Sequence, residues 1–223
     1  MKYTTVAELF DLSGTLAAPL LRSVDTPWAA LPQLKAYIIE LGKTLHAEEF
    51  DSPCEYVWIA KDAKIAPSAS INGPCIIDHG AELRQGAFVR GSVIVGKNAV
   101  VGNSVELKNA ILFDGAQVPH FNYVGDSILG VKAHMGAGAV TSNVKSDKTL
   151  VTIRGTDGTL ETGLKKVGAM LGDGAEIGCN SVLNPGTVIG RRAQVYPTSS
   201  VRGIVPQDHI YKDAQHIVLR CAK

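Results

Sequence analysis

Aliphatic residues recur at every sixth position over much of the chain. In each hexad the first position is aliphatic, and the residue four places later is small or β-branched. The aliphatic positions of the longest run are Ile59, Ile65, Ile71, Ile77, Leu83, Val89, Val95 and Val101. The same register returns between residues 171 and 205. Amphipathic helices repeat their apolar positions every 3.6 residues and half-buried strands every two, so a period of six predicts neither.

A period of six is typical of short strands that are separated by sharp corners. The aliphatic residue points into the interior and packs on its counterpart in the next coil, while the small residue lies at the corner. Three such sides close a triangular coil of about 18 residues, which is the hexapeptide form of the parallel β-helix. Each coil then covers its neighbour. We therefore predict an all-β solenoid, with the repeat domain over residues 53–206.

The six-residue register breaks in two places, and breaks in a regular pattern tend to mark functional sites. The first break, residues 107–124, has one side that is a residue short, and it contains Pro119 and His120 followed by the aromatic residues Phe121 and Tyr123. The second break lies at about residues 144–166. Two strand-like segments there flank Asp157-Gly158, which predicts a β-hairpin inserted into the coil. The insertion has few large apolar residues, so we expect the coil to fold without it.

The two ends of the chain do not follow the repeat. Thr26 and Pro27 are typical of a helix start, and apolar residues then follow at steps of three and four over residues 27–46. A shorter helix is expected near residues 6–10. We predict that residues 1–52 form a helical cap over the open end of the solenoid, whose strand edges would otherwise be unpaired. Residues 207–223 form a C-terminal tail with one further strand.

Composition narrows the classes of partner. The 223 residues include 22 basic and 21 acidic ones, for a net charge of +1, which favours neither nucleic acid nor an anionic membrane. No apolar run approaches the ~20 residues of a membrane span. The four cysteines form no C-x-x-C pair, and the first residues do not resemble a signal peptide. We expect a reduced, cytoplasmic protein with no nucleic-acid or membrane partner.

Three segments around the first break resemble a known family. They are Glu-Leu-Lys-Asn-Ala at 106–110, Val-Pro-His-Phe-Asn-Tyr-Val-Gly-Asp-Ser at 118–127 and Gly-Ala-Gly-Ala-Val-Thr-Ser-Asn at 136–143. The chain is similar, over about residues 59–206, to the acetyltransferase domain of bifunctional N-acetylglucosamine-1-phosphate uridylyltransferase/glucosamine-1-phosphate acetyltransferase. The resemblance implies a left-handed β-helix and a homotrimer with sites between subunits. It also implies acetyl transfer from acetyl-CoA to an amino-sugar phosphate or a nucleotide sugar, without a metal in the coil.

The resemblance also implies individual roles. His120 falls on the catalytic base, and Glu106 on an acidic residue near it. The positions matched to acceptor binding are Arg90, Lys108, Tyr123, His134 and Lys148. The positions matched to acetyl-CoA binding are Ala137, Asn143, Cys179 and Pro197. The sequence departs from the family at three positions: His134 replaces an asparagine, Val144 replaces a tyrosine after Asn143, and Lys148 stands in for the lysine of a shorter loop. The identity of the acceptor sugar therefore stays open.

Elementary chemistry agrees with part of this assignment. An amine that attacks a thioester must lose a proton, which a neutral histidine can accept near pH 7. Arg90 and Lys108 are 18 residues apart, hence one coil apart, and two stacked cations suit a phosphate. Residues 1–52 have no glycine-rich nucleotide loop, so we expect no uridylyltransferase activity from this chain.

Two alternatives to an acetyltransferase stay open. The solenoid is also the fold of carbonic anhydrases that bind a metal through three histidines, and His79, His120 and His134 lie on the coil. The histidine expected five residues after His120 is replaced by Gly125, which disfavours such a metal site. The second alternative is a non-catalytic sugar-nucleotide-binding or scaffold β-helix, suggested by the changes at His134 and Val144.

Overall fold

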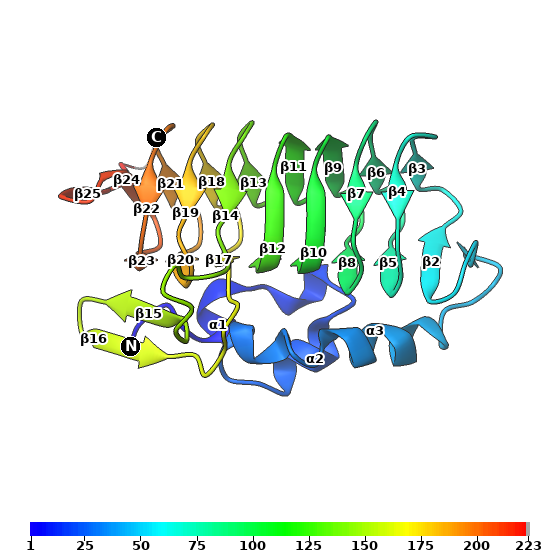
Figure 1. The fold of residues 1–223 in the computed structure, drawn as a ribbon, viewed down its shortest axis with the longest axis horizontal. Coiled ribbons are helices and arrows are strands. Elements are labelled where there is room, and N and C mark those ends of the chain that lie inside the picture. Colours follow the sequence, from blue (N-terminus) through cyan, green and yellow to red (C-terminus); the bar gives the residue numbers. More distant parts are fainter. Residues whose placement is uncertain (222–223) are drawn as a thin grey trace.

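The computed structural model describes residues 1–221 as a parallel β-solenoid of about nine turns, with a helical segment along one side and a hairpin beside it (Figure 1). The strands form three faces of a triangular prism. The predicted parallel β-helix with a hairpin insertion is confirmed.

The bounds of the strands follow the three faces in turn. The first face contains β3 (Lys64–Ile65), β6 (Glu82–Leu83), β9 (Val100–Asn103), β11 (Gln117–His120), β13 (His134–Met135), β18 (Glu176–Ile177), β21 (Gln194–Val195) and β24 (His209–Asp213). The second contains β4 (Ser70–Ile71), β7 (Phe88–Val89), the first halves of β10 (Glu106–Leu112) and β12 (Tyr123–Leu129), β14 (Val140–Thr141), β19 (Val182–Leu183) and β22 (Ser200–Val201). The third contains β2 (Val57–Ala60), β5 (Cys75–Ile77), β8 (Val93–Val95), the second halves of β10 and β12, β17 (Ala169–Leu171), β20 (Thr187–Ile189) and β23 (Ile204–Val205). Two antiparallel strands flank the coils: β1 (Phe50–Asp51) pairs with β2, and β25 (His216–Leu219) pairs with β24.

The predicted interior positions are largely buried, and they form one continuous core through the solenoid. Most coils repeat after 18 residues, as in the pairing of Cys75 with Val93. Two successive coils are one residue shorter, because Val93 pairs with Ala110, and Ala110 in turn pairs with Ser127. The sequence predicted only one shortened side, within the first break at residues 107–124. In both short coils the corner is replaced by a continuous seven-residue strand, β10 or β12.

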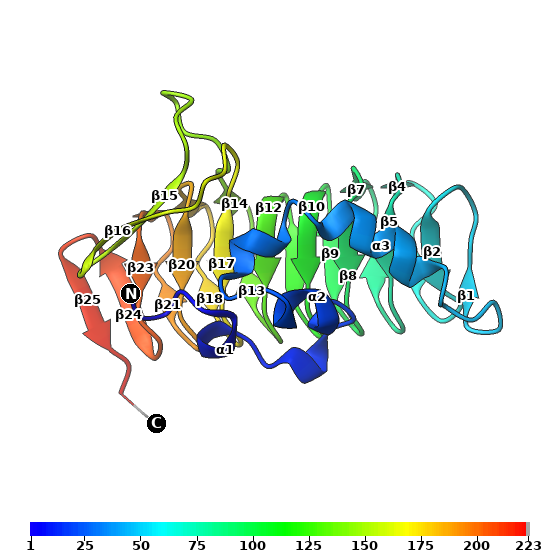
Figure 2. The ribbon, with the colours of Figure 1, turned by 90° about the horizontal axis from the view of Figure 1, so that it is seen from below.

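Residues 1–49, which we call the N-terminal strap, run along the third face rather than over an end of the solenoid (Figures 1 and 2). The strap contains α1 (Val6–Leu9), η1 (Leu12–Gly14), α2 (Ala18–Arg22), η2 (Pro27–Ala30) and α3 (Leu34–Gly42). The single helix predicted over residues 27–46 is therefore divided in two. Within the described residues, no helix has the length and apolar character needed to span a membrane.

The strap lies on this face because the third-face strands carry an outward apolar residue in every coil. These residues pair in one ladder: Ile76, Ile94, Ile111, Ile128, Met170 and Val188. All six are fully buried beneath strap residues that include Trp28, Leu34 and Ile38. Covering such a ladder removes a long apolar strip from water. The prediction of an end cap was wrong for this reason.

The inserted hairpin consists of β15 (Thr152–Gly155) and β16 (Gly158–Glu161), which pair antiparallel. It packs against the coil rather than projecting freely, since Val151 and Ile153 are fully buried in the same cluster as the strap. Gly203, which has a φ of 85°, permits this approach. A Cβ atom at Gly203 would lie 2.5 Å from the carbonyl oxygen of Arg154.

Candidate active site

Four of the predicted residues lie on one edge of the prism, where the first face turns into the second. They are His120, Ala137, Cys179 and Pro197, and we call them the corner column. Backbone hydrogen bonds join their corners: Gly138 N donates to His120 O at 3.0 Å, and Asn180 N donates to Ala137 O at 2.8 Å. Thr198 N donates to Cys179 O at 2.8 Å. The four residues therefore occupy equivalent places on successive coils, about 4.8 Å apart.

His120 ends β11 with an exposed side chain. Its imidazole makes no hydrogen bond within residues 1–221, whereas its backbone is held firmly: His120 N donates to Asn122 Oδ1 at 3.1 Å. Asn122 is only 2% exposed, and its Nδ2 donates to Gly136 O and Ala139 O of the next coil. Asn122 thus fixes the corner while it leaves the imidazole accessible to a ligand. Sequence reasoning did not identify this residue.

A second group of predicted residues surrounds the buried carboxylate of Asp126 on the second face. Asp126 is 4% exposed and accepts hydrogen bonds from Lys108 Nζ at 3.3 Å and Asn109 Nδ2 at 2.8 Å. Asn143 Nδ2 donates to Asp126 Oδ2 and to Tyr123 Oη, the latter at 3.2 Å. We call Lys108, Asn109, Tyr123, Asp126 and Asn143 the face cluster. Asn109 and Asp126 were absent from the sequence prediction, although both occur in the segments that carry the family resemblance.

The two cations predicted to hold a phosphate are both paired with carboxylates. Arg90 NH1 donates to Glu106 Oε1 at 2.7 Å, and this hydrogen bond raises the pKa of the Arg90 guanidinium. Lys108 pairs with Asp126. Burial raises the pKa of Tyr123, whose phenol lies between these charges. The predicted clamp therefore carries no net charge, and its groups suit hydrogen bonding to a sugar better than attraction of an anion.

His134 lies beside the corner column, in a shallow groove on the first face. Its Nδ1 lies 2.8 Å from Glu176 Oε2, and both residues line a hollow of about 280 Å³ together with Cys179 and Pro197. Gly136, which also lines the hollow, lets the two coils stack closely here, because a Cβ atom would lie 2.7 Å from the backbone nitrogen of Cys179. A narrow extended ligand could lie along this groove and reach His120.

Lys148 stands apart from the other predicted residues. It lies in an exposed turn of the insertion with a φ of 60°, and its backbone nitrogen bonds to Lys145 O at 3.0 Å. Lys145, rather than Lys148, lines a hollow of about 350 Å³ between the hairpin and the second face. We call this hollow the hairpin pocket; its polar lining includes Ser142, Lys145, Asp147, Arg154, Asn184 and Arg202. The two arginines were not predicted as site residues.

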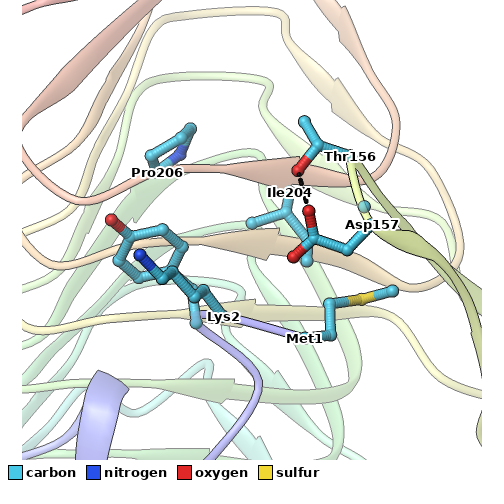
Figure 3. Close-up of a pocket in the computed structure, with 8 residues that line it drawn as sticks. Met1, Lys2, Thr156, Asp157, Ile204 and Pro206 are labelled. Atoms are coloured by element: carbon cyan, nitrogen blue, oxygen red, sulfur yellow. Dashed lines mark hydrogen bonds between the residues drawn. The ribbon is translucent and has the colours of Figure 1, made fainter.

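A further hollow, of about 240 Å³, lies where the strap meets the hairpin turn (Figure 3). Met1, Lys2 and Tyr3 form one side, and the turn at Thr156 and Asp157 forms another, with Thr156 Oγ1 donating to Asp157 Oδ1 at 3.0 Å. None of the predicted site residues lines it. It is a packing junction between two segments that cover the third face.

The histidines of the coil do not gather at one place. His79 pairs with Asp62 at 2.9 Å, and His134 pairs with Glu176. In the part of the chain that the structure describes, no three histidine, cysteine or acidic side chains form a group suited to a metal ion.

Comparison with known proteins places this site in context. A family model described as the GMPPB C-terminal domain matches residues 71–206. A bifunctional sugar-1-phosphate nucleotidylyltransferase/acetyltransferase of Sulfurisphaera tokodaii is 31% identical over 166 residues, covering 66% of this chain and 41% of the relative. A bifunctional protein GlmU of Methanococcus maripaludis is 32% identical over 176 residues, covering 70% of this chain and 43% of the relative. The chain thus spans about two fifths of the length of these curated relatives.

Among solved structures, one similar protein is a variant of AntD, an N-acyltransferase from Bacillus cereus, in complex with dTDP-4-amino-4,6-dideoxyglucose and coenzyme A. It is 18% identical, with a TM-score of 0.39, over 80% of this chain and 94% of that one. The resemblance found in the sequence is confirmed by the family model and the curated relatives.

Proposed function

Because the chain belongs to the family of the GMPPB C-terminal domain, whose model covers more than half of it, we propose that it is an acetyltransferase of the sugar-nucleotide type. The donor is acetyl-CoA, and the acceptor is the amine of an amino-sugar phosphate or a nucleotide sugar. Two observations support this proposal: a 31%-identical relative whose name includes acetyltransferase, and the exposed side chain of His120 on the edge where the first face turns into the second.

In the proposed reaction the acceptor amine attacks the carbonyl carbon of the acetyl thioester. A carbon–nitrogen bond forms while the carbon–sulfur bond breaks. His120 accepts the proton that the amine loses, and CoA leaves as a thiolate that takes up a proton. General-base catalysis of this kind contributes about 10²–10⁴-fold in rate.

We assign one substrate to the corner column with its groove and the other to the second face. We assign acetyl-CoA to the corner column and the first-face groove, where Ala137, Cys179 and Pro197 leave room for an extended arm. We assign the acceptor sugar to the second face, where Tyr123 and Asn143 offer hydrogen bonds. Arg90 and Lys108 contact the acceptor from neighbouring coils, with His134 and Lys148 at the margins of the site.

The proposal depends most on His120, whose backbone is fixed while its side chain is accessible. Its backbone is fixed by the buried Asn122, and its imidazole makes no hydrogen bond among the described residues. The coil histidines His79 and His134 each pair with a carboxylate, whereas the His120 imidazole has no such partner among the described residues. His120 instead lies at the junction of the two proposed binding regions.

The test is an assay of CoA release with amino-sugar 1-phosphates and nucleotide-linked amino sugars as acceptors. We expect His120→Ala to lower turnover about 10²–10⁴-fold. Its melting temperature should change little, because the side chain is exposed. His79→Ala, which removes another partly exposed coil histidine, is the matched control and should keep full turnover.

Wild-type turnover by His120→Ala with a working acceptor would disprove the assignment of the base. If no acceptor is turned over and calorimetry detects no binding of acetyl-CoA, the non-catalytic sugar-nucleotide-binding or scaffold function replaces the enzyme.

A further inference from the structure

The arginines of the hairpin pocket differ from those elsewhere on the coil. Arg84, Arg90, Arg191 and Arg192 each pair with a carboxylate. Among the side chains of residues 1–221, no carboxylate lies within salt-bridge distance of Arg154 or Arg202. Among the described residues, the one side-chain hydrogen bond of Arg202 is to Asn184, to whose Oδ1 it donates at 3.1 Å. Both guanidinium groups therefore retain donors for a ligand.

The fold brings these two arginines together from distant parts of the sequence. Arg154 belongs to β15 of the hairpin, whereas Arg202 follows β22 of the coil. The hairpin is held against the coil by the buried Val151 and Ile153, and Gly203 allows the backbone of Arg154 to lie directly beside the Arg202 corner. The two cations thus line one pocket, Arg154 from the hairpin and Arg202 from the coil, and packing sets the position of both segments.

The charge of the pocket is suited to an anion. Lys145, Arg154 and Arg202 contribute three positive charges, and Asp147 contributes one negative charge. Asp147 lies on the outer turn, 3.5 Å from Lys145. In contrast, the two cations of the second face, Arg90 and Lys108, are each neutralised by a carboxylate. The unneutralised positive charge of the second face therefore lies beneath the hairpin and not at the position that the family resemblance indicated.

We propose that the hairpin pocket binds the diphosphate group of a small-molecule ligand. Guanidinium groups bind phosphate oxygens through paired hydrogen bonds, and two of them lining one pocket can hold adjacent phosphates. Asn184 and Ser142 add neutral polar groups to the lining. The volume of about 350 Å³ lies within the range of small-molecule sites.

The position of the pocket identifies the part of the ligand that it receives. Ser142 lines the pocket, and the next residue, Asn143, belongs to the face cluster. Ser142, Asn184 and Arg202 follow paired positions on β14, β19 and β22, so Arg202 lies two coils, about 10 Å, beyond Ser142. A ligand whose diphosphate lies in the pocket can therefore extend to the face cluster. This part of the inference rests on the proposed function, and it makes a nucleoside-diphosphate sugar, rather than a sugar 1-phosphate, the acceptor.

The first experiment measures anion binding without turnover. Calorimetry with inorganic pyrophosphate tests the pocket itself; UDP, GDP and CoA then test the two sources of a diphosphate. We expect Arg154→Gln and Arg202→Gln each to weaken pyrophosphate binding by about tenfold or more, because each removes a charge-assisted contact. Arg84→Gln, a coil arginine of the first face, is the matched control and should bind as wild type does. Melting temperatures should be unchanged, since both pocket arginines are exposed.

The results separate the proposal from its alternatives. Binding of UDP or GDP that is lost in Arg202→Gln supports a nucleotide-linked acceptor, and binding of CoA alone assigns the same diphosphate site to the donor. Absence of pyrophosphate binding, or binding that is weakened by Lys108→Gln and not by Arg202→Gln, would overturn the proposal. Failure of the acetyl-transfer assay with intact pyrophosphate binding would refute the proposed function while the pocket stands.

Discussion

Asn122 is the residue on which the geometry of the candidate site most depends. Its side chain bonds to His120 N, Gly136 O and Ala139 O, and it is almost fully buried. A truncated side chain would remove this partner from His120 N and Ala139 O, at a cost of ~1–3 kcal/mol for each group left unsatisfied, whereas Gly136 O would still accept from Ala139 N. The residue therefore links the position of the proposed base to the folding of the coil.

We expect Asn122→Ala to lower the free energy of unfolding by about 2–4 kcal/mol. Urea denaturation followed by circular dichroism measures the change. Gln117→Ala, at an exposed position of β11, the strand just before Asn122, serves as the control and should change stability by less than about 0.5 kcal/mol. An equal effect of both substitutions would contradict the role given to Asn122.

A second residue-scale prediction concerns pH. Burial raises the pKa of the Asp78 carboxyl, which is 2% exposed and accepts a hydrogen bond from His79 N at 2.8 Å. The native state therefore binds the proton more tightly than the unfolded chain, so stability falls as the pH rises from about the ordinary value of 3.8 through the raised one. Asp78→Asn keeps an acceptor for His79 N and removes the titration.

The Asp78→Asn variant should accordingly be more stable than wild type at pH 7, with the difference shrinking toward pH 4. Urea midpoints measured across this range test the prediction. A variant that is less stable than wild type at pH 7 would show that the carboxylate stabilises the corner in its charged form.

At the scale of elements, the hairpin has a structural role that its composition did not indicate. Few of its residues are large and apolar, yet Val151 and Ile153 are fully buried between the coil and the strap. Burial of such side chains stabilises by about 1.5–3 kcal/mol each. The sequence led us to expect that the coil folds without the hairpin. From the structure we expect the opposite: the hairpin, the strap and the third face should unfold together.

Ile153→Ala tests this coupling. We expect it to lower the free energy of unfolding by about 2–4 kcal/mol, as for other buried aliphatic truncations. Leu150→Ala changes a neighbouring residue that is 42% exposed, and it should cost less than about 1 kcal/mol. If thermal unfolding shows equal, small effects for both, the hairpin is only loosely attached.

At the scale of the whole molecule, the strap and hairpin leave two of the three faces available to a partner. The edge between those faces carries the corner column and two exposed aromatic residues, Phe121 (61% exposed) and Tyr196 (46% exposed). Exposed apolar residues around a site favour an interface, and a triangular prism packs naturally about a threefold axis. We therefore expect a homotrimer in which this edge meets the neighbouring subunit and completes the site.

Light scattering should then give a mass near three times 23.6 kDa. Phe121→Glu should dissociate the trimer, whereas Leu219→Glu, at a residue 66% exposed on the outer strand β25, should not. A mass near that of one chain at micromolar concentration would contradict this prediction.

The sequence alone determined the solenoid and the order of the candidate residues along it. In a stack of similar coils each interior residue packs on its counterpart one repeat away, so spacing along the chain translates directly into position. The family resemblance pointed to His120, Ala137, Cys179 and Pro197, and the structure aligns them on one edge across a shortened coil and the insertion. The hairpin was predictable from a local signal, because Asp157-Gly158 is typical of a tight turn between two strands.

Contacts between segments that the repeat does not relate were decided by the tertiary structure alone. In Cys75-Ile76-Ile77 the inward and outward residues are all apolar, so the sequence does not distinguish a covered face from an open one. The strap was therefore predicted over an end of the solenoid, whereas it lies along the third face. The placement of Arg154 and Arg202 in one pocket depends on how the hairpin packs against the coil. The ion pairs of Arg90 and Lys108 join neighbouring coils, but their carboxylate partners depend on side-chain positions that the spacing does not fix. Charge and packing act through distances in the folded molecule, and those distances are set when the coils stack and the hairpin closes on them.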